Sequence, residues 1–78
     1  MAKIAWTTIK AREFEYLVPM TEDQKAVFRD MVSGMSVVHT SMTYNMSTRK
    51  VDYIRRWIKD QYNDVKKYSP LLKQNPHL

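Results

Sequence analysis

One apolar stripe constrains the fold of this chain more than any other feature of its sequence. Its members recur at spacings of three, four, four and three residues: Val51, Ile54, Ile58, Tyr62 and Val65. This spacing puts all of these side chains on one face of an α-helix. Ser47 precedes the stripe as an N-cap, and Ser69-Pro70 follows it as a stop signal. We therefore expect a helix over residues 48–67, about 30 Å long at a rise of ~1.5 Å per residue.

A second helix is predicted between Thr21 and Gly34. Thr21 is a good N-cap, Gln24 is its capping-box partner, and Glu22 and Asp23 stand where the helix dipole favours acids. Gly34 is a typical helix stop. The apolar face of this helix consists of Val27, Phe28, Met31 and Val32.

Two shorter helices complete the pattern. Residues 8–17 form a loosely helical segment that Pro19 ends, and its expected apolar positions are Ile9, Phe14, Tyr16 and Leu17. Ser36 can cap a helix over residues 37–44. Asn45 then tolerates the left-handed backbone of a tight interhelical turn.

The composition agrees with helices joined by short connections. The chain has 78 residues, is 44% apolar and contains one glycine, which is typical of a small helical core and not of a turn-rich β-sandwich. We expect an all-α bundle of about four helices, with one domain over residues 1–70 and a tail over residues 71–78. Two roles of the tail remain open, docking through Leu71 and Leu72 or remaining mobile.

Several classes of protein are disfavoured by what the sequence lacks. It has no cysteine, and its two histidines, His39 and His77, have no neighbouring ligands, so we expect no metal site. No serine stands in a nucleophile setting and the carboxylates are scattered, so we expect no enzyme and no cofactor. No apolar run approaches the ~20 residues of a membrane span, and the charged N-terminus does not resemble a secretory signal. A cytoplasmic protein is expected.

The net charge of +5 lies entirely in the C-terminal part of the chain. Residues 1–46 carry five basic and five acidic side chains, whereas residues 47–78 carry eight basic and three acidic ones. Such segregation indicates a surface that faces a polyanion. A solvated helix face with an excess of Lys and Arg is the alternative.

The basic segment follows a pattern typical of a helix-turn-helix. A short capped helix, a turn of about three residues and a second capped helix with basic side chains in its first turns match the motif whose second helix enters the DNA major groove. If the stripe faces inward, the residues expected to face bases are Thr48, Arg49, Lys50, Asp52, Tyr53 and Arg56. The residues expected at phosphates are Ser36, Ser47, Arg55 and Lys59. Asp52 either reads a cytosine amino group or pairs with Arg56, and we favour the pair.

The segment GMSVVHTSMTYNMSTRKVDYIRRWIKD resembles the helix-turn-helix of bacterial sigma factors (region four) and of related response-regulator output domains. The residues that match in type and spacing are Gly34, Met35, Ser36, Met46, Ser47 and Val51. Ser41 stands at the small-residue position of the helix crossing, Tyr44 at a core Leu position and Asn45 at the turn Gly. The preceding TEDQKAVFRDMVSG resembles the acid-rich helix before the motif, so the likeness covers roughly residues 21–60.

Three residues depart from that pattern. Thr40 stands where the family has a larger aliphatic residue, and Val38 and Met42 are apolar where exposed residues are usual. The N-terminal segment or a second subunit would cover Val38 and Met42, unless the helix is oriented differently.

The resemblance implies a duplex DNA-binding protein, sequence-specific or semi-specific, acting as a small transcriptional regulator of bacterial or bacteriophage type. It would be nucleoid-associated or active in a phage-infected cell. Two alternatives remain: an adaptor that binds RNA polymerase or a phage assembly protein, and the DNA-binding part of a packaging or recombination complex. A homodimer through Tyr62, Val65 and Tyr68 is also open. We favour an N-terminal helix that covers this end, because Trp6 and Phe14 need a place to be buried.

Overall fold

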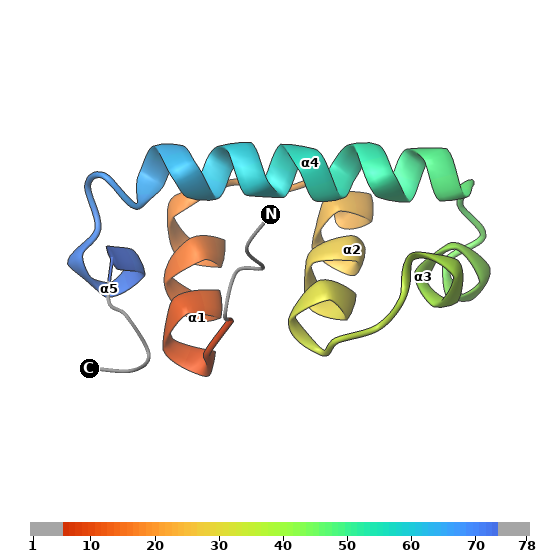
Figure 1. The fold of residues 1–78 in the computed structure, drawn as a ribbon, viewed down its shortest axis with the longest axis horizontal. Coiled ribbons are helices and arrows are strands. Elements are labelled where there is room, and N and C mark those ends of the chain that lie inside the picture. Colours follow the sequence, from red (N-terminus) through yellow and green to blue (C-terminus); the bar gives the residue numbers. More distant parts are fainter. Residues whose placement is uncertain (1–5, 74–78) are drawn as a thin grey trace.

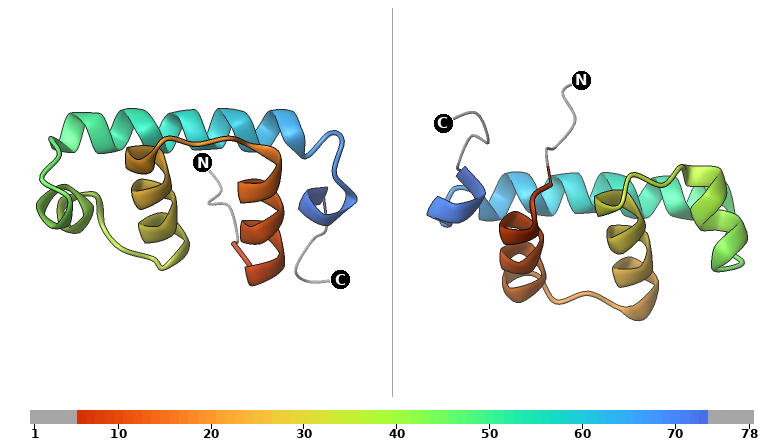
Figure 2. Two further views of the ribbon diagram at one scale, coloured as in Figure 1. Left: turned by 180° about the vertical axis from the view of Figure 1, so that it is seen from behind. Right: turned by 90° about the horizontal axis from the view of Figure 1, so that it is seen from below.

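The computed structural model describes residues 6–73, which fold into an all-helical bundle around one long helix. The helices are α1 (Thr8–Leu17), α2 (Glu22–Val32), α3 (Val37–Thr43), α4 (Thr48–Val65) and α5 (Pro70–Lys73). In Figure 1, α4 runs the length of the molecule with α1 and α2 side by side beneath it, and α3 and α5 lie at opposite ends. The views from behind and below show the same arrangement (Figure 2). The expected all-α class is confirmed.

The helix starts follow the capping residues of the sequence. At the first four helices a Ser or Thr hydroxyl accepts a hydrogen bond from the backbone N–H three residues on: Lys10 to Thr7 (3.2 Å), Gln24 to Thr21 (3.3 Å), His39 to Ser36 (3.0 Å) and Lys50 to Ser47 (3.1 Å). The capping box is complete, since the Thr21 N–H donates to Gln24 Oε1 at 3.0 Å. Three of these caps were predicted. The Thr7 cap was not.

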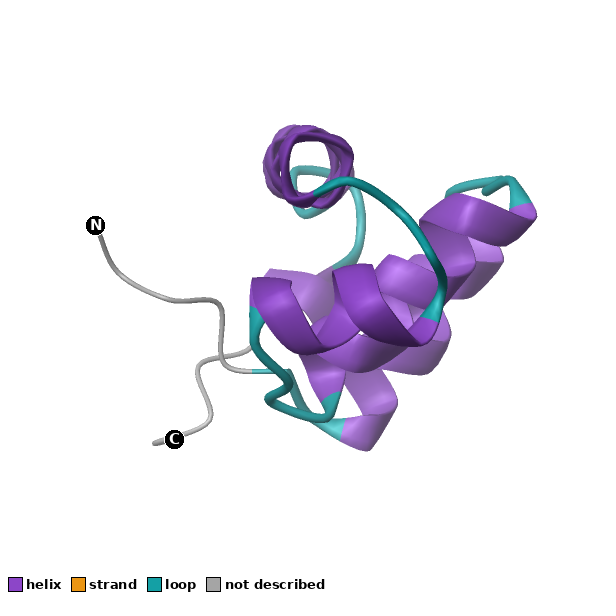
Figure 3. Ribbon diagram, turned by 90° about the vertical axis from the view of Figure 1, so that its right-hand side faces the viewer, coloured by secondary structure: helices purple, strands orange, loops and turns teal. Residues whose placement is uncertain are grey.

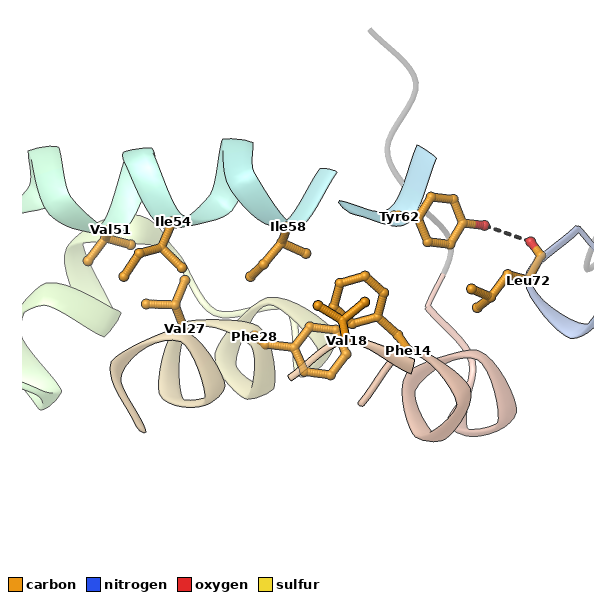
Figure 4. Close-up of a cluster of buried hydrophobic side chains, with 9 residues drawn as sticks. All are labelled: Phe14, Val18, Val27, Phe28, Val51, Ile54, Ile58, Tyr62 and Leu72. Carbon is orange, nitrogen blue, oxygen red and sulfur yellow. Dashed lines mark hydrogen bonds between the residues drawn. The ribbon is translucent and has the colours of Figure 1, made fainter. Parts of the chain in front are cut away.

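The apolar stripe of α4 forms one side of the hydrophobic core. The buried apolar residues are Phe14, Val18, Val27, Phe28, Val51, Ile54, Ile58, Tyr62 and Leu72. Figure 4 shows the side chains of α1 and α2 directed toward those of α4. The predicted stripe is confirmed, with Val65 half-buried at its end. The face that looks away from α1 and α2 is therefore left for solvent or a partner.

An aromatic cluster fixes the N-terminal segment to the middle of the bundle. The Trp6 ring makes edge contacts with Phe14, Phe28 and Tyr62, at centroid distances of 5.4, 5.0 and 5.3 Å. The N-terminal region thus covers the stripe around Tyr62, as favoured above. Tyr68, which was expected to extend the stripe, is 83% exposed.

The predicted apolar face of α1 was wrong in three of its four positions. Phe14 is buried as expected, together with Lys10 and with Val18 just past the end of the helix, whereas Ile9, Tyr16 and Leu17 are 58%, 85% and 39% exposed. The Lys10 Nζ donates to the Tyr62 hydroxyl at 3.5 Å. The aliphatic stem of a lysine can lie in a core while its amine finds a partner, so this face includes a residue that an apolar pattern leaves out.

The end of the described chain docks against the bundle. Leu72 is 1% exposed, and its carbonyl accepts a hydrogen bond of 2.9 Å from the Tyr62 hydroxyl (Figure 4). The Ser69 hydroxyl donates to Glu13 Oε2 at 2.9 Å. Of the two roles left open for this segment, docking is observed for Leu72, while Leu71 remains 38% exposed. The rest of the expected tail, with His77, lies outside the described residues.

Candidate nucleic-acid interface

The predicted helix-turn-helix segment consists of α3, a four-residue connection over residues 44–47 and the start of α4. Asn45 adopts φ 53°, and the Met46 N–H donates to the Ser41 carbonyl at 2.9 Å, which closes the turn. Figure 3, which looks along α4, shows α3 lying across it. Ser41 is buried, and α3 is in contact with α4. The left-handed Asn45 agrees with the sequence prediction, and the burial of Ser41 is compatible with its expected place at a helix crossing.

A buried hydrogen bond ties α3 to α2. Thr40 is fully buried, and its hydroxyl lies 2.8 Å from Asp30 Oδ2 and 3.1 Å from the Ser36 carbonyl. The hydroxyl has one proton, and the shorter contact to the charged Asp30 is the stronger bond. This explains why a threonine stands where an aliphatic residue was expected, because Asp30 needs a donor at that point. Two features of the sequence indicate this bond only when they are taken together: a polar residue at an expected apolar position, and an acid near the end of the preceding helix.

The outer face of the first turns of α4 is exposed and basic. The exposed residues of this outer arc are Thr48, Arg49, Asp52, Tyr53 and Arg56. Arg49 and Arg56 lie seven residues apart and so project from the same side of the helix, opposite the buried stripe. The expected ion pair between Asp52 and Arg56 is not observed. Neither side chain takes part in an ion pair in residues 6–73. Both arginines of the arc are therefore available to a partner.

Lys50 lies at the edge of the outer arc and forms an ion pair with a residue of α2. Its amine pairs with the Asp23 carboxylate in the first turn of α2, and both side chains are about half exposed. This pair holds the start of α4 against the start of α2. Asp23 was recognised only as a helix-dipole residue, since 27 residues separate it from Lys50.

The residues expected at phosphates are half-buried or already take part in hydrogen bonds within the protein. Arg55 is half-buried, and its Nη2 donates to the Met35 carbonyl at 2.6 Å, which joins α4 to the loop before α3. Lys59 is half-buried on the same flank. The hydroxyls of Ser36 and Ser47 are exposed but already accept hydrogen bonds as N-caps.

The outward side of α3 is apolar and uncovered. Val38 is 58% exposed and Met42 is 78% exposed, so no described part of the chain shields them. The expected cover by the N-terminal segment is not seen in residues 6–73. Tyr44 is 42% exposed, so its predicted core position was wrong. The turn already has Met46 packed against the core, which leaves the Tyr44 ring outside.

Residues 6–73 contain no group of three or more His, Asp or Glu side chains arranged to hold a metal ion. Within the same part of the chain, no helix combines the length and apolar character of a membrane span. The outer arc of α4 is a candidate site because of its exposed Arg49 and Arg56.

Comparisons with known proteins add no assignment to this geometry. No protein-family model, curated protein or solved structure matches the chain. The resemblance to sigma-type helix-turn-helix domains stays a prediction, and it depends on the residues between Gly34 and Asp60 and on the arrangement described above.

Proposed function

We propose that this protein binds duplex DNA through the outer arc of α4 and acts as a small transcriptional regulator of bacterial or bacteriophage type. The observation that carries the proposal is the exposure of Arg49 and Arg56 on the N-terminal half of a helix whose opposite face is buried. A helix presented in this way can enter a groove without disturbing the core that positions it.

The size and chemistry of the arc suit the major groove. An α-helix with its side chains is about 10–12 Å wide and the major groove of B-DNA is about 12 Å wide. An arginine in the first turns can donate two hydrogen bonds to guanine, which contributes about 1–3 kcal/mol of discrimination against another base. Arg49 is the base-reading residue of this proposal, and Thr48 and Tyr53 contact neighbouring bases or phosphates.

The charge along α4 limits the length of the interface. The arc is basic from Arg49 to Arg56, but the exposed Asp60 and Asp64 follow on the same side of the helix. Carboxylates are repelled by phosphates, so the C-terminal half of α4 is lifted away from the DNA. The helix therefore enters the groove by its N-terminal end.

The test is a binding titration with fluorescently labelled duplex DNA. Arg49→Ala and Arg56→Ala should each weaken binding by about 1–3 kcal/mol, about 5- to 150-fold. Arg12→Ala is the matched control, because Arg12 is an exposed arginine on α1, outside the arc. If the two arc variants bind as tightly as the control while their circular dichroism spectra remain native, DNA binding through the arc is refuted.

A protein-interaction adaptor is the second candidate, favoured by the exposed Val38 and Met42 on α3. Its partner would be an apolar protein surface, such as one on RNA polymerase or a phage assembly protein. Salt separates the two candidates. Binding through about six phosphates weakens by on the order of 10³-fold or more between about 50 and 200 mM salt, whereas an apolar protein interface is much less sensitive.

A further inference from the structure

A groove of about 780 Å³ lies beside the outer arc. Its walls come from the end of α2, the loop into α3, one flank of α4 and the N-terminal segment, and its large apolar side chains are Trp6, Met31 and Met35. Sites for small organic ligands have volumes of about 300–1,000 Å³ and combine apolar walls with a few polar groups. The groove has the size and the mixed lining of such a site.

One wall of the groove is apolar and held in place. Trp6 is fixed by its edge contacts with Phe14 and Phe28 in the core. Met31 packs against the same core, and Met35 lies in the loop whose carbonyl binds Arg55. Thioether side chains adapt their shape and make favourable contacts with aromatic rings. This wall suits a flat aromatic body.

Two hydrogen-bond donors of the groove residues have no acceptor. The indole Nε1 of Trp6 and the Nε of Arg55 are buried, and neither donates to an atom in the described part of the chain. Buried donors are nearly always satisfied, so two unsatisfied donors on residues of one groove mark a part of the molecule where an acceptor is missing.

The charges of the groove restrict that acceptor to a single negative charge. Arg55 is a half-buried cation that forms no ion pair in residues 6–73. A guanidinium in this setting favours a carboxylate, which it can bind through two hydrogen bonds. The other charged residues of the lining are two bases, Arg56 and Lys59, and two acids, Asp52 and Asp60, so the lining as a whole carries one net positive charge. A monocarboxylate fits this balance better than a phosphate ester.

We propose that the groove binds a small aromatic monocarboxylate, with its ring against Trp6, Met31 and Met35 and its carboxylate at Arg55. The position of the groove gives this ligand a regulatory role that depends on the proposed DNA binding. Asp52 and Arg56 belong to both the groove and the outer arc, so the ligand and DNA compete for the same side of α4. The ligand lowers DNA affinity, and by thermodynamic reciprocity DNA lowers ligand affinity by the same factor.

The binding test uses ¹⁵N-labelled full-length protein and sodium indole-3-acetate. The indole N–H signal of Trp6, assigned with a Trp57→Phe variant, reports on the groove directly. We expect a saturable shift of this signal with half-saturation below about 10 mM. The neutral amide, indole-3-acetamide, has the same ring without the charge and should bind about tenfold or more weakly. This pair of ligands needs no variant that risks unfolding.

Two results would overturn the groove proposal. One is a Trp6 signal that does not move with the acid, and the other is equal affinity for acid and amide. Arg55→Gln should weaken binding of the acid to the level of the amide, while Arg12→Gln should leave it unchanged.

The regulatory role is measured separately by titrating DNA with the acid at saturation. DNA affinity that does not change would overturn the competition. If no duplex binds even without the acid, the proposed function fails while the groove result still stands.

Discussion

Replacing Thr40 by valine removes one hydroxyl from the junction of α2 and α3 while keeping the shape of the side chain. Thr40 is fully buried, and the Asp30 carboxylate has no other side-chain donor in residues 6–73. A hydrogen bond to a charged group contributes about 1.5–3 kcal/mol. Asp30 is half-buried and recovers part of this from solvent, so we expect a loss of about 1–2 kcal/mol.

The assay is urea unfolding followed by far-ultraviolet circular dichroism, with thermal unfolding as a second readout. For a domain of this size the expected loss corresponds to a fall in Tm of about 4–16 °C. Thr43→Val is the matched control, because the Thr43 hydroxyl bonds only the exposed His39 carbonyl within α3. The control should change stability by less than about 0.5 kcal/mol.

The opposite result has a clear meaning. The sigma-type pattern has an aliphatic residue at this position, so a junction held by apolar packing alone would make Thr40→Val neutral or stabilising. A double-mutant cycle with Asp30→Asn would then show no coupling. Either outcome refutes the account of how α3 is held in place.

Three further predictions concern the core, the turn before α4 and the ion pair that joins α4 to α2. Ile58→Ala leaves a cavity beneath the middle of α4, where Ile58 is fully buried, and should cost about 2–5 kcal/mol in urea unfolding. Asn45→Val places a β-branched residue at φ 53° and should cost about 1–2 kcal/mol, whereas Asn45→Gly should be neutral or stabilising, and equal Tm values for the two would contradict this. Lys50→Ala breaks a half-exposed ion pair with Asp23, so its stability should fall by no more than about 1 kcal/mol at low salt and by less at high salt.

The parts of the fold that sequence predicted are those determined within a few residues. The stripe of α4 fixes its buried face by spacing alone, and Ser47 and Thr21 fix helix starts through bonds that reach only three residues. Asn45 was identified for the same reason, since its conformation depends on its own side chain. Local chemistry was sufficient in each case.

The features that sequence missed depend on distant partners. Lys10 is buried because Tyr62, 52 residues away, accepts its hydrogen bond. Lys50 and Arg55 read as DNA contacts in the sequence, yet the structure ties them to Asp23 and to the Met35 carbonyl. An exposed arginine and one that braces a loop look the same in a sequence. The groove beside α4 has the same origin, because its walls come together only in the folded chain.

The proposed role of Arg49 in reading duplex DNA can be tested by selecting bound sequences from a random duplex library, in parallel for the natural chain and for Arg49→Ala. We expect an enriched motif for the natural chain that contains a guanine, and a relaxed preference at that guanine in the variant. No enrichment, or one identical motif bound equally well by both proteins, would contradict it.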